Sequence, residues 1–296
     1  MELGRISTAM VTPFSGSGAI DFDKTTLLIE HLIANGSDSL VVCGTTGESP
    51  TLTAVEKEEL LSFTINTVNK RIPVIAGTGS NSTAESIENT KMADRIGADG
   101  VMLVTPYYNK PDQRGLYAHF STIAAETKLP VLLYNIPGRS VINMLPETTI
   151  SLSKINNIRA MKEASGDLEQ MAEIITGTDD GFSVYSGDDG LTLPLLSIGG
   201  SGVVSVASHV VGNEMQKMIA AFDEGRTKEA AAMHRAFIPL FRALFASPNP
   251  VPVKYALRKL DIDTGGVRLP LVGYDEENIV FDKVWESFLK NELIFA

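Results

Sequence analysis

Eight short apolar runs, rich in β-branched residues, recur at intervals of about two to three dozen residues, and this spacing most constrains the fold. Several runs, such as 101–104 and 131–133, are apolar throughout, which is typical of strands covered on both faces of a parallel sheet. Helical patterns fill the gaps, so the spacing predicts consecutive βα units. The runs lie near residues 5–12, 39–44, 73–77, 100–105, 130–135, 158–164, 182–186 and 202–207.

Eight such units predict an α/β fold, a (β/α)₈ TIM barrel, over residues 1–224. A doubly wound open sheet is the alternative, but no G-x-G-x-x-G follows the first run and no Walker-type loop appears. Residues 225–296 have helical patterns, interrupted by a stiff linker at 247–250, and predict a small C-terminal helical appendage. Thr53 and Ser82, each followed three residues later by glutamate, predict capping boxes.

Composition narrows the partners and the compartment. The net charge of −11 and the lack of a basic cluster argue against a nucleic-acid partner. No apolar run approaches the roughly 18 residues of a membrane span, the N-terminus lacks a signal sequence, and the single Cys43 cannot form an internal disulfide. We therefore expect a cytoplasmic protein without a membrane partner. The four histidines lack ligand spacing, so no metal site is predicted.

Polar residues cluster where the predicted strands end, which in a TIM barrel is the active-site face. Lys162 is the most informative, because a lysine inside an apolar strand loses hydration and its pKa falls. A neutral amine can attack a ketone and form an imine. Alternatively, Lys162 lies at the barrel rim, pairs with Glu163 or extends to water. Position alone leaves both interpretations open. The polar segments are 44–48, 105–111, 134–139, 160–165 and 186–190.

Neighbouring strand ends favour the imine interpretation. Tyr134 ends the strand before that of Lys162, so its phenol could shuttle protons at an imine. Thr45 and Thr46, between two glycines, suit a carboxylate, and Arg139 could bind a second one bidentately. Each also has a plainer interpretation: Tyr134 as an aromatic residue at the barrel rim, the threonine pair as part of an ordinary turn, and Arg139 as an exposed loop arginine. Asp189 lies in a Gly-Asp-Asp-Gly segment that we interpret as a turn.

Together, the segment 44–48 (GTTGE), the segment 134–139 (YNIPGR) and the strand lysine Lys162 resemble the dihydrodipicolinate synthase / N-acetylneuraminate lyase family. The resemblance runs from residues 8–14 through the helical tail. It implies a lyase that condenses pyruvate with aspartate semialdehyde in lysine and diaminopimelate biosynthesis. It also implies no cofactor beyond a covalent imine with pyruvate at Lys162, and a homotetramer built as two tight dimers.

The resemblance also implies roles for individual residues. Lys162 forms the imine, and Tyr134 moves protons, coupled through Thr45 to Tyr108 of a neighbouring subunit. The substrate-binding residues are Thr46, Arg139, the backbone at Val204, and Gly187. Arg139 receives the carboxylate of the semialdehyde. The residues that match the family's effector site are Ser49, Asn81, Glu85 and Tyr107.

Ala54 and Lys57 stand where lysine-inhibited members of that family carry histidines, so we expect weak or absent inhibition by lysine. Two alternatives remain. One is a pyruvate-dependent aldolase for a sugar acid, which would share Lys162 and Tyr134. The other is a keto-acid-binding protein without catalysis. A phosphate-binding barrel is disfavoured, because 187–190 is acidic and no cation lies nearby in sequence.

Overall fold

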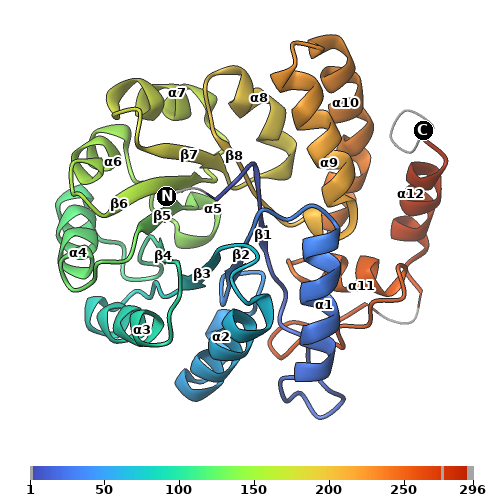
Figure 1. Cartoon of the computed structure of the whole chain (residues 1–296), viewed down its shortest axis with the longest axis horizontal. Helices are drawn as coiled ribbons and strands as arrows, with labels where there is room; N and C mark the ends of the chain where they lie inside the picture. Colours follow the sequence, from blue (N-terminus) through green and yellow to red (C-terminus); the bar gives the residue numbers. More distant parts are fainter. Residues whose placement is uncertain (1–2, 275–276, 292–296) are drawn as a thin grey trace.

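The computed structural model describes residues 3–274 and 277–291. Eight parallel strands form a closed barrel in sequence order, with β8 pairing back onto β1 (Figure 1). Each strand falls within one of the eight predicted runs, and the (β/α)₈ fold is confirmed. The strands are β1 (Ile6–Ala9), β2 (Ser39–Val42), β3 (Val74–Gly77), β4 (Gly100–Val104), β5 (Val131–Asn135), β6 (Ile158–Glu163), β7 (Ser183–Ser186) and β8 (Gly202–Ser205).

Helices between the strands surround the barrel (Figure 1). The capping box of Thr53 is present, with Glu56 bonded back to the cap. At Ser82 the prediction is only half right, because the Glu85 carboxylate accepts from the Ser80 hydroxyl instead. The elements are α1 (Phe22–Ala34), η1 (Ser49–Thr51), α2 (Ala54–Val68), α3 (Thr83–Arg95), α4 (Gln113–Ala125), α5 (Pro137–Ser140), α6 (Pro146–Ser153), α7 (Leu168–Gly177), η2 (Asp189–Leu191), α8 (Thr192–Ser197) and α9 (Ser208–Asp223).

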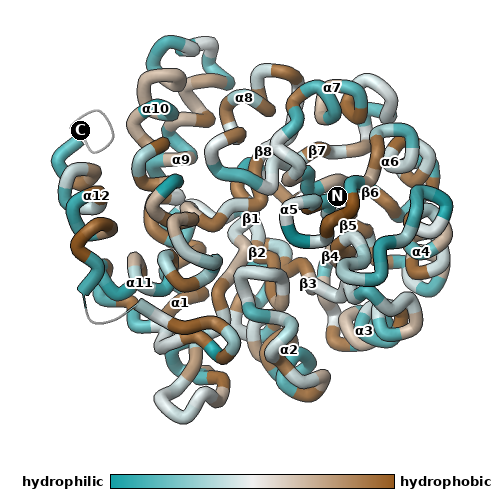
Figure 2. Tube along the Cα trace, turned by 180° about the vertical axis from the view of Figure 1, so that it is seen from behind, coloured by the Kyte–Doolittle hydropathy of each residue, from teal (hydrophilic) through white to brown (hydrophobic). Residues whose placement is uncertain are grey.

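The strands are buried on both faces and so divide the core into two shells. One cluster fills the barrel interior and includes Leu3, Ile75 and Leu132. A larger one lies between the barrel and the helices. In Figure 2 brown stretches mark the strands, while teal is common on the surrounding helices. Alternate residues of a strand therefore face different shells, which decides whether a polar side chain reaches the barrel mouth.

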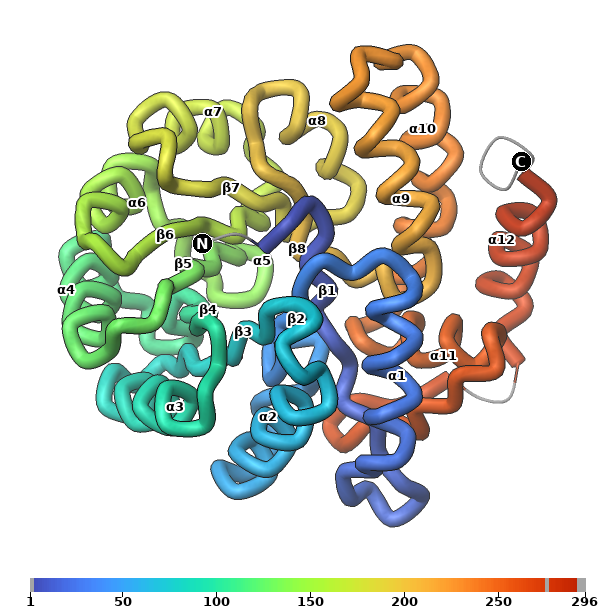
Figure 3. The backbone as a smooth tube through the Cα atoms, viewed as in Figure 1, coloured from blue at the N-terminus to red at the C-terminus, as the bar shows by residue number. Residues whose placement is uncertain are grey.

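The predicted C-terminal appendage consists of α10 (Thr227–Leu244), α11 (Val251–Arg258) and α12 (Ile279–Leu289), and residues 292–296 lie outside the described part. α10 and α11 pack on α9. After α11 the chain runs back to the start of the protein, and the Phe14 amide donates to the Thr264 carbonyl (Figure 3). Among the described residues, no helix has the length and apolar character needed to cross a bilayer.

Candidate active site

Lys162 and Tyr134 lie side by side within the barrel. They are direct partners across β6 and β5, and the Lys162 Nζ is 4.1 Å from the centre of the Tyr134 ring. Both residues are buried, with exposed fractions of 5% and 3%. The structure therefore brings together the two residues that the sequence predicts to be the imine-forming amine and the proton carrier.

Burial lowers the pKa of Lys162 from its ordinary value of 10.5 to about 8. The Asp189 carboxylate acts against this shift and the Arg139 guanidinium acts with it. At neutral pH the fraction of neutral amine is then more than about a hundredfold larger than for an exposed lysine. Lys162 is thus chemically suited to attack a carbonyl carbon.

The pKa of Tyr134 shifts in the direction opposite to that of Lys162. Burial raises the pKa of its phenol to about 12, although the Arg139 charge and a hydrogen bond from Thr45 lower it in part. At neutral pH the phenol is therefore protonated and can donate a proton to a neighbouring group.

Thr45 and Thr46 lie in a tight turn after β2. The Gly47 amide donates to the Gly44 carbonyl at 3.1 Å, and the Thr46 side chain is buried. The Nδ2 of Asn249 donates to the Thr46 hydroxyl oxygen at 2.8 Å. The sequence placed Asn249 in a stiff linker, and no local signal indicated that it reaches the threonine turn.

A cavity of about 240 Å³ opens from Tyr134 toward the surface. Its lining joins three predicted site residues, Thr45, Tyr134 and Arg139, with three residues of the predicted effector set, Ser49, Glu85 and Tyr107. Lys57 lines the same cavity. Asn81 donates from its side chain to the Tyr107 carbonyl at 3.0 Å. The two predicted groups are therefore neighbours in one cavity.

The predicted site residues Val204, Gly187 and Tyr108 lie outside the lining of this cavity. Val204 is buried on β8 among the barrel interior residues. Gly187 lies against Lys162, since a Cβ at this position would be 3.1 Å from the lysine Cε and 2.6 Å from the Ala164 Cβ. Tyr108 is 89% exposed and has a φ of 75°. Within this single chain, Tyr108 is not among the residues that line the described cavity.

Glu163 is not the partner of Lys162, in contrast to the alternative interpretation. It points to the opposite face of β6 and accepts hydrogen bonds from the Asn135 and Gln170 side chains and the Ser165 amide. Asn143, three residues beyond the α5 helix that carries Arg139, binds both Asn135 and Gln170. A buried polar network thus joins β5, β6 and the Arg139 segment behind the site.

Asp189 is a site residue that the sequence analysis missed. Its carboxylate is buried and accepts from the Ser205 hydroxyl and from the amides of Val206 and Ala207, at the start of α9. Burial raises its pKa to about 6. The Gly-Asp-Asp-Gly pattern indicated only a turn, and a buried carboxylate that acts on Lys162 follows from packing across β7 and β8.

The described residues contain no group of three His, Cys, Asp or Glu side chains that could hold a metal ion. What the site offers is an amine of lowered pKa, a protonated phenol, hydroxyls and one exposed guanidinium. This set can form an imine with a keto acid, move protons at it and bind carboxylates.

Comparisons with known proteins show which family the chain resembles over nearly its whole length. Residues 2–281 match the model of the dihydrodipicolinate synthetase family. A 4-hydroxy-tetrahydrodipicolinate synthase of Bacillus velezensis is 58% identical over 277 residues, which cover 94% of this chain and 96% of the relative. The crystal structure of a dihydrodipicolinate synthase from Bacillus anthracis has 53% identity and a TM-score of 0.95, covering 98% of this chain and 99% of that one. A dihydrodipicolinate synthase from Cyanidioschyzon merolae with lysine bound has 49% identity and a TM-score of 0.93, with 97% of each chain covered.

Proposed function

Because the chain belongs to the dihydrodipicolinate synthetase family, we propose that Lys162 forms the Schiff base in the family's reaction. The chain is a lyase with 4-hydroxy-tetrahydrodipicolinate synthase activity, which condenses pyruvate with aspartate semialdehyde in lysine and diaminopimelate biosynthesis. The observation that carries the role of Lys162 is its buried Nζ, 4.1 Å from the Tyr134 ring centre, with a pKa lowered to about 8.

The neutral Nζ attacks the keto carbon of pyruvate, and loss of water leaves a protonated imine. The imine withdraws electrons, so the methyl carbon of pyruvate loses a proton and becomes an enamine. The enamine carbon attacks the aldehyde carbon of the second substrate, whose oxygen takes up a proton. The amino group of that substrate then adds to the imine carbon and displaces the Lys162 Nζ, which closes the ring of the product and frees the lysine. Tyr134 carries protons in these steps, and the hydrogen bond from Thr45 orients its phenol. In this proposal the imine supplies the electron sink, and no further cofactor takes part.

Thr46 and the backbone at Val204 hold the carboxylate of pyruvate beside Lys162. The Thr46 hydroxyl already accepts from Asn249, so its own proton is free to point toward a carboxylate. Gly187 leaves the space that the Lys162 side chain needs, because a Cβ there would crowd the lysine Cε. Together these residues position the keto carbon for attack.

Arg139 receives the carboxylate of aspartate semialdehyde. Its guanidinium is exposed and lines the cavity that leads to Tyr134. A bidentate pair with a carboxylate adds both affinity and orientation. The second substrate then approaches the enamine from the cavity side.

Tyr108 completes the proton path from a second copy of the chain, through Thr45 to Tyr134. Its 89% exposure supports this role, because a tyrosine that serves a neighbouring subunit must project from its own. The assembly in this proposal is a homotetramer of two tight dimers in the cytoplasm. Each chain comprises a barrel, residues 1–224, and a helical region, residues 225–296.

Ser49, Asn81, Glu85 and Tyr107 form the outer, effector end of the site. Three of them line the same cavity as Tyr134, so a ligand there would alter access to the imine. Lys57 also lines this end and adds positive charge, which disfavours a second cation such as lysine.

A substrate comparison tests the proposal. We expect rapid turnover of pyruvate with aspartate semialdehyde in a coupled assay, and no cleavage of N-acetylneuraminate or a 2-keto-3-deoxy sugar acid. Turnover of a sugar acid alone would identify a sugar-acid aldolase instead. Tight pyruvate binding without turnover of either would identify a binding protein.

A further inference from the structure

The turn that carries Thr45 and Thr46 ends at Glu48, which has a left-handed backbone conformation with a φ of 56°. The Glu48 amide donates to the Thr45 carbonyl, so Glu48 closes the turn directly. A residue with a Cβ keeps such a conformation only when its surroundings hold it there. What holds Glu48 therefore also fixes the direction in which the two threonines point.

The contacts of the Glu48 carboxylate come from the C-terminal helical region. The Lys254 Nζ lies 2.8 Å from Oε1, and both side chains are almost fully buried, with exposed fractions of 3% and 1%. The backbone amide of Arg268 donates to Oε2 at 2.8 Å. Residues more than 200 positions away in sequence thus bind the end of the threonine turn.

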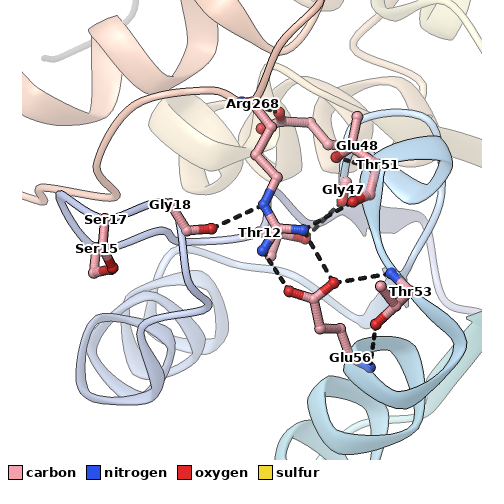
Figure 4. A network of polar contacts seen from close by, with 10 residues as sticks. All are labelled: Thr12, Ser15, Ser17, Gly18, Gly47, Glu48, Thr51, Thr53, Glu56 and Arg268. Atoms are coloured by element: carbon pink, nitrogen blue, oxygen red, sulfur yellow. Dashed lines mark hydrogen bonds and ion pairs between the residues drawn. The ribbon is translucent and has the colours of Figure 1, made fainter.

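Further hydrogen bonds and an ion pair connect Arg268 and Thr12 with the segment around the threonine turn (Figure 4). The Arg268 guanidinium donates to the carbonyls of Gly18 and Thr51 and pairs with Glu56 at the start of α2. The Thr12 hydroxyl donates to the Gly47 carbonyl at 2.7 Å. Apart from the bond to Gly18, which lies between β1 and α1, these contacts reach the threonine turn or the η1 and α2 segments that follow it.

Asn249, in the linker before α11, and Lys254, on α11, both contact residues of the turn. Lys254 donates to the Thr12 carbonyl at 2.7 Å in addition to its ion pair, and Asn249 donates to the Thr46 hydroxyl. We call Asn249, Lys254 and Arg268 the C-terminal latch. The latch binds the turn at Thr46 through Asn249 and at Glu48 through the other two residues.

A buried ion pair adds little net stability over a well-packed apolar pair, because desolvation offsets most of the attraction. The two charged groups must nevertheless stay in contact, since separating them or removing either one leaves an uncompensated buried charge. We propose that the Lys254–Glu48 pair, as the centre of the C-terminal latch, positions Thr45 and Thr46 for pyruvate binding and proton transfer. This inference rests on the proposed roles of Thr46 and Lys162. It makes the helical appendage part of the catalytic machinery.

The test compares Lys254→Met, Glu48→Gln and the double variant with the wild-type protein. Borohydride trapping of the pyruvate imine over a range of pyruvate concentrations gives the half-saturating concentration, and urea denaturation gives stability. Lys24→Met is the matched control, because it breaks the more exposed Lys24–Asp263 ion pair that also joins the N-terminal part to the C-terminal region.

We expect the single variants to lose stability and the double variant to regain much of it, because the double variant leaves no unpaired charge. The half-saturating pyruvate concentration should nevertheless stay raised by at least about tenfold in the double variant, since a turn misplaced by a fraction of an ångström binds poorly. If both the half-saturating pyruvate concentration and the stability of the double variant returned to wild-type values, the pair would be merely structural. An equal rise of the half-saturating pyruvate concentration in Lys24→Met would also overturn the proposal.

Hydrogen exchange separates this inference from the proposed function. A peptide covering residues 44–51 should exchange faster in the double variant than in the wild-type protein or Lys24→Met. If the wild-type protein forms no adduct with pyruvate, the proposed role of Lys162 fails, and the exchange data still decide the latch. Unchanged exchange in this peptide would overturn the latch whatever the chemistry.

Discussion

The Nζ of Lys162 lies over the face of the Tyr134 ring, 4.1 Å from its centre, and the two residues are partners across β5 and β6. The arrangement places an amine beside a phenol in a buried site. Burial shifts the two pKa values in opposite directions, to about 8 for Lys162 and about 12 for Tyr134. At neutral pH the pair therefore offers a protonated phenol next to an amine that is neutral in about a tenth of the molecules, against fewer than about one in a thousand for an ordinary lysine.

The rate of imine formation with pyruvate should rise with pH, level off above about pH 9 and have its midpoint near pH 8. Below this pH the ammonium form of Lys162 predominates, and above it the neutral amine does. Rapid quenching of the imine with borohydride, followed by mass spectrometry, gives the rate at each pH. A rate that climbs steadily to pH 10 would mean that the pKa of Lys162 keeps its ordinary value.

Arg139→Ala should lower kcat/KM for aspartate semialdehyde by about 10- to 100-fold, the loss expected for a charged hydrogen-bonded pair. Imine formation with pyruvate should persist. Its pH midpoint should move to higher pH, because the Arg139 charge lowers the pKa of Lys162. Steady-state kinetics and trapping measure the two effects separately. Arg114→Ala, an exposed arginine on α4, is the control. Unchanged semialdehyde kinetics in Arg139→Ala would remove Arg139 from the substrate site.

Glu163→Gln should destabilise the protein by about 1–3 kcal/mol, because glutamine has one acceptor oxygen where three neighbouring groups now donate to a carboxylate. The exposed Glu169 on α7 provides the control, and Glu169→Gln should change stability by less than about 0.5 kcal/mol. Urea denaturation gives both values. Equal stabilities of the two variants would mean that the network behind β5 and β6 contributes nothing to the fold.

Free lysine should inhibit weakly or not at all. Of Ala54 and Lys57, Lys57 is the one that lines the outer cavity, and Ala54 is exposed at the start of α2. A second ammonium beside Lys57 would be repelled. Titration of lysine into the coupled assay measures the effect. Strong inhibition below about 1 mM, which corresponds to a binding free energy of roughly 4 kcal/mol or more, would contradict this expectation.

The barrel and its central pair could be predicted because both depend on local pattern and strand order. Apolar runs alternating with helical segments indicate βα units, and consecutive strands of such a barrel are neighbours. Tyr134 and Lys162 were therefore expected to be adjacent. The direction of Glu163 also follows from strand geometry, since consecutive residues of β6 face opposite sides. This rule argues against the alternative that pairs Glu163 with Lys162.

The C-terminal latch and Asp189 could not be predicted. Asn249 meets Thr46 across 203 positions of sequence, and Lys254 meets Glu48 through the packing of α11. No periodic pattern specifies how an appended helical region docks on a barrel. Asp189 lies in a segment whose composition is that of an exposed turn, and its burial depends on β8 and α9 closing over it.

Borohydride reduction in the presence of pyruvate, followed by peptide mass mapping, tests the role of Lys162 most directly. The account predicts one reduced pyruvyl adduct, on the peptide that contains Lys162, and loss of both adduct and turnover in Lys162→Met. Labelling of a different lysine, or turnover that survives in Lys162→Met, would contradict it.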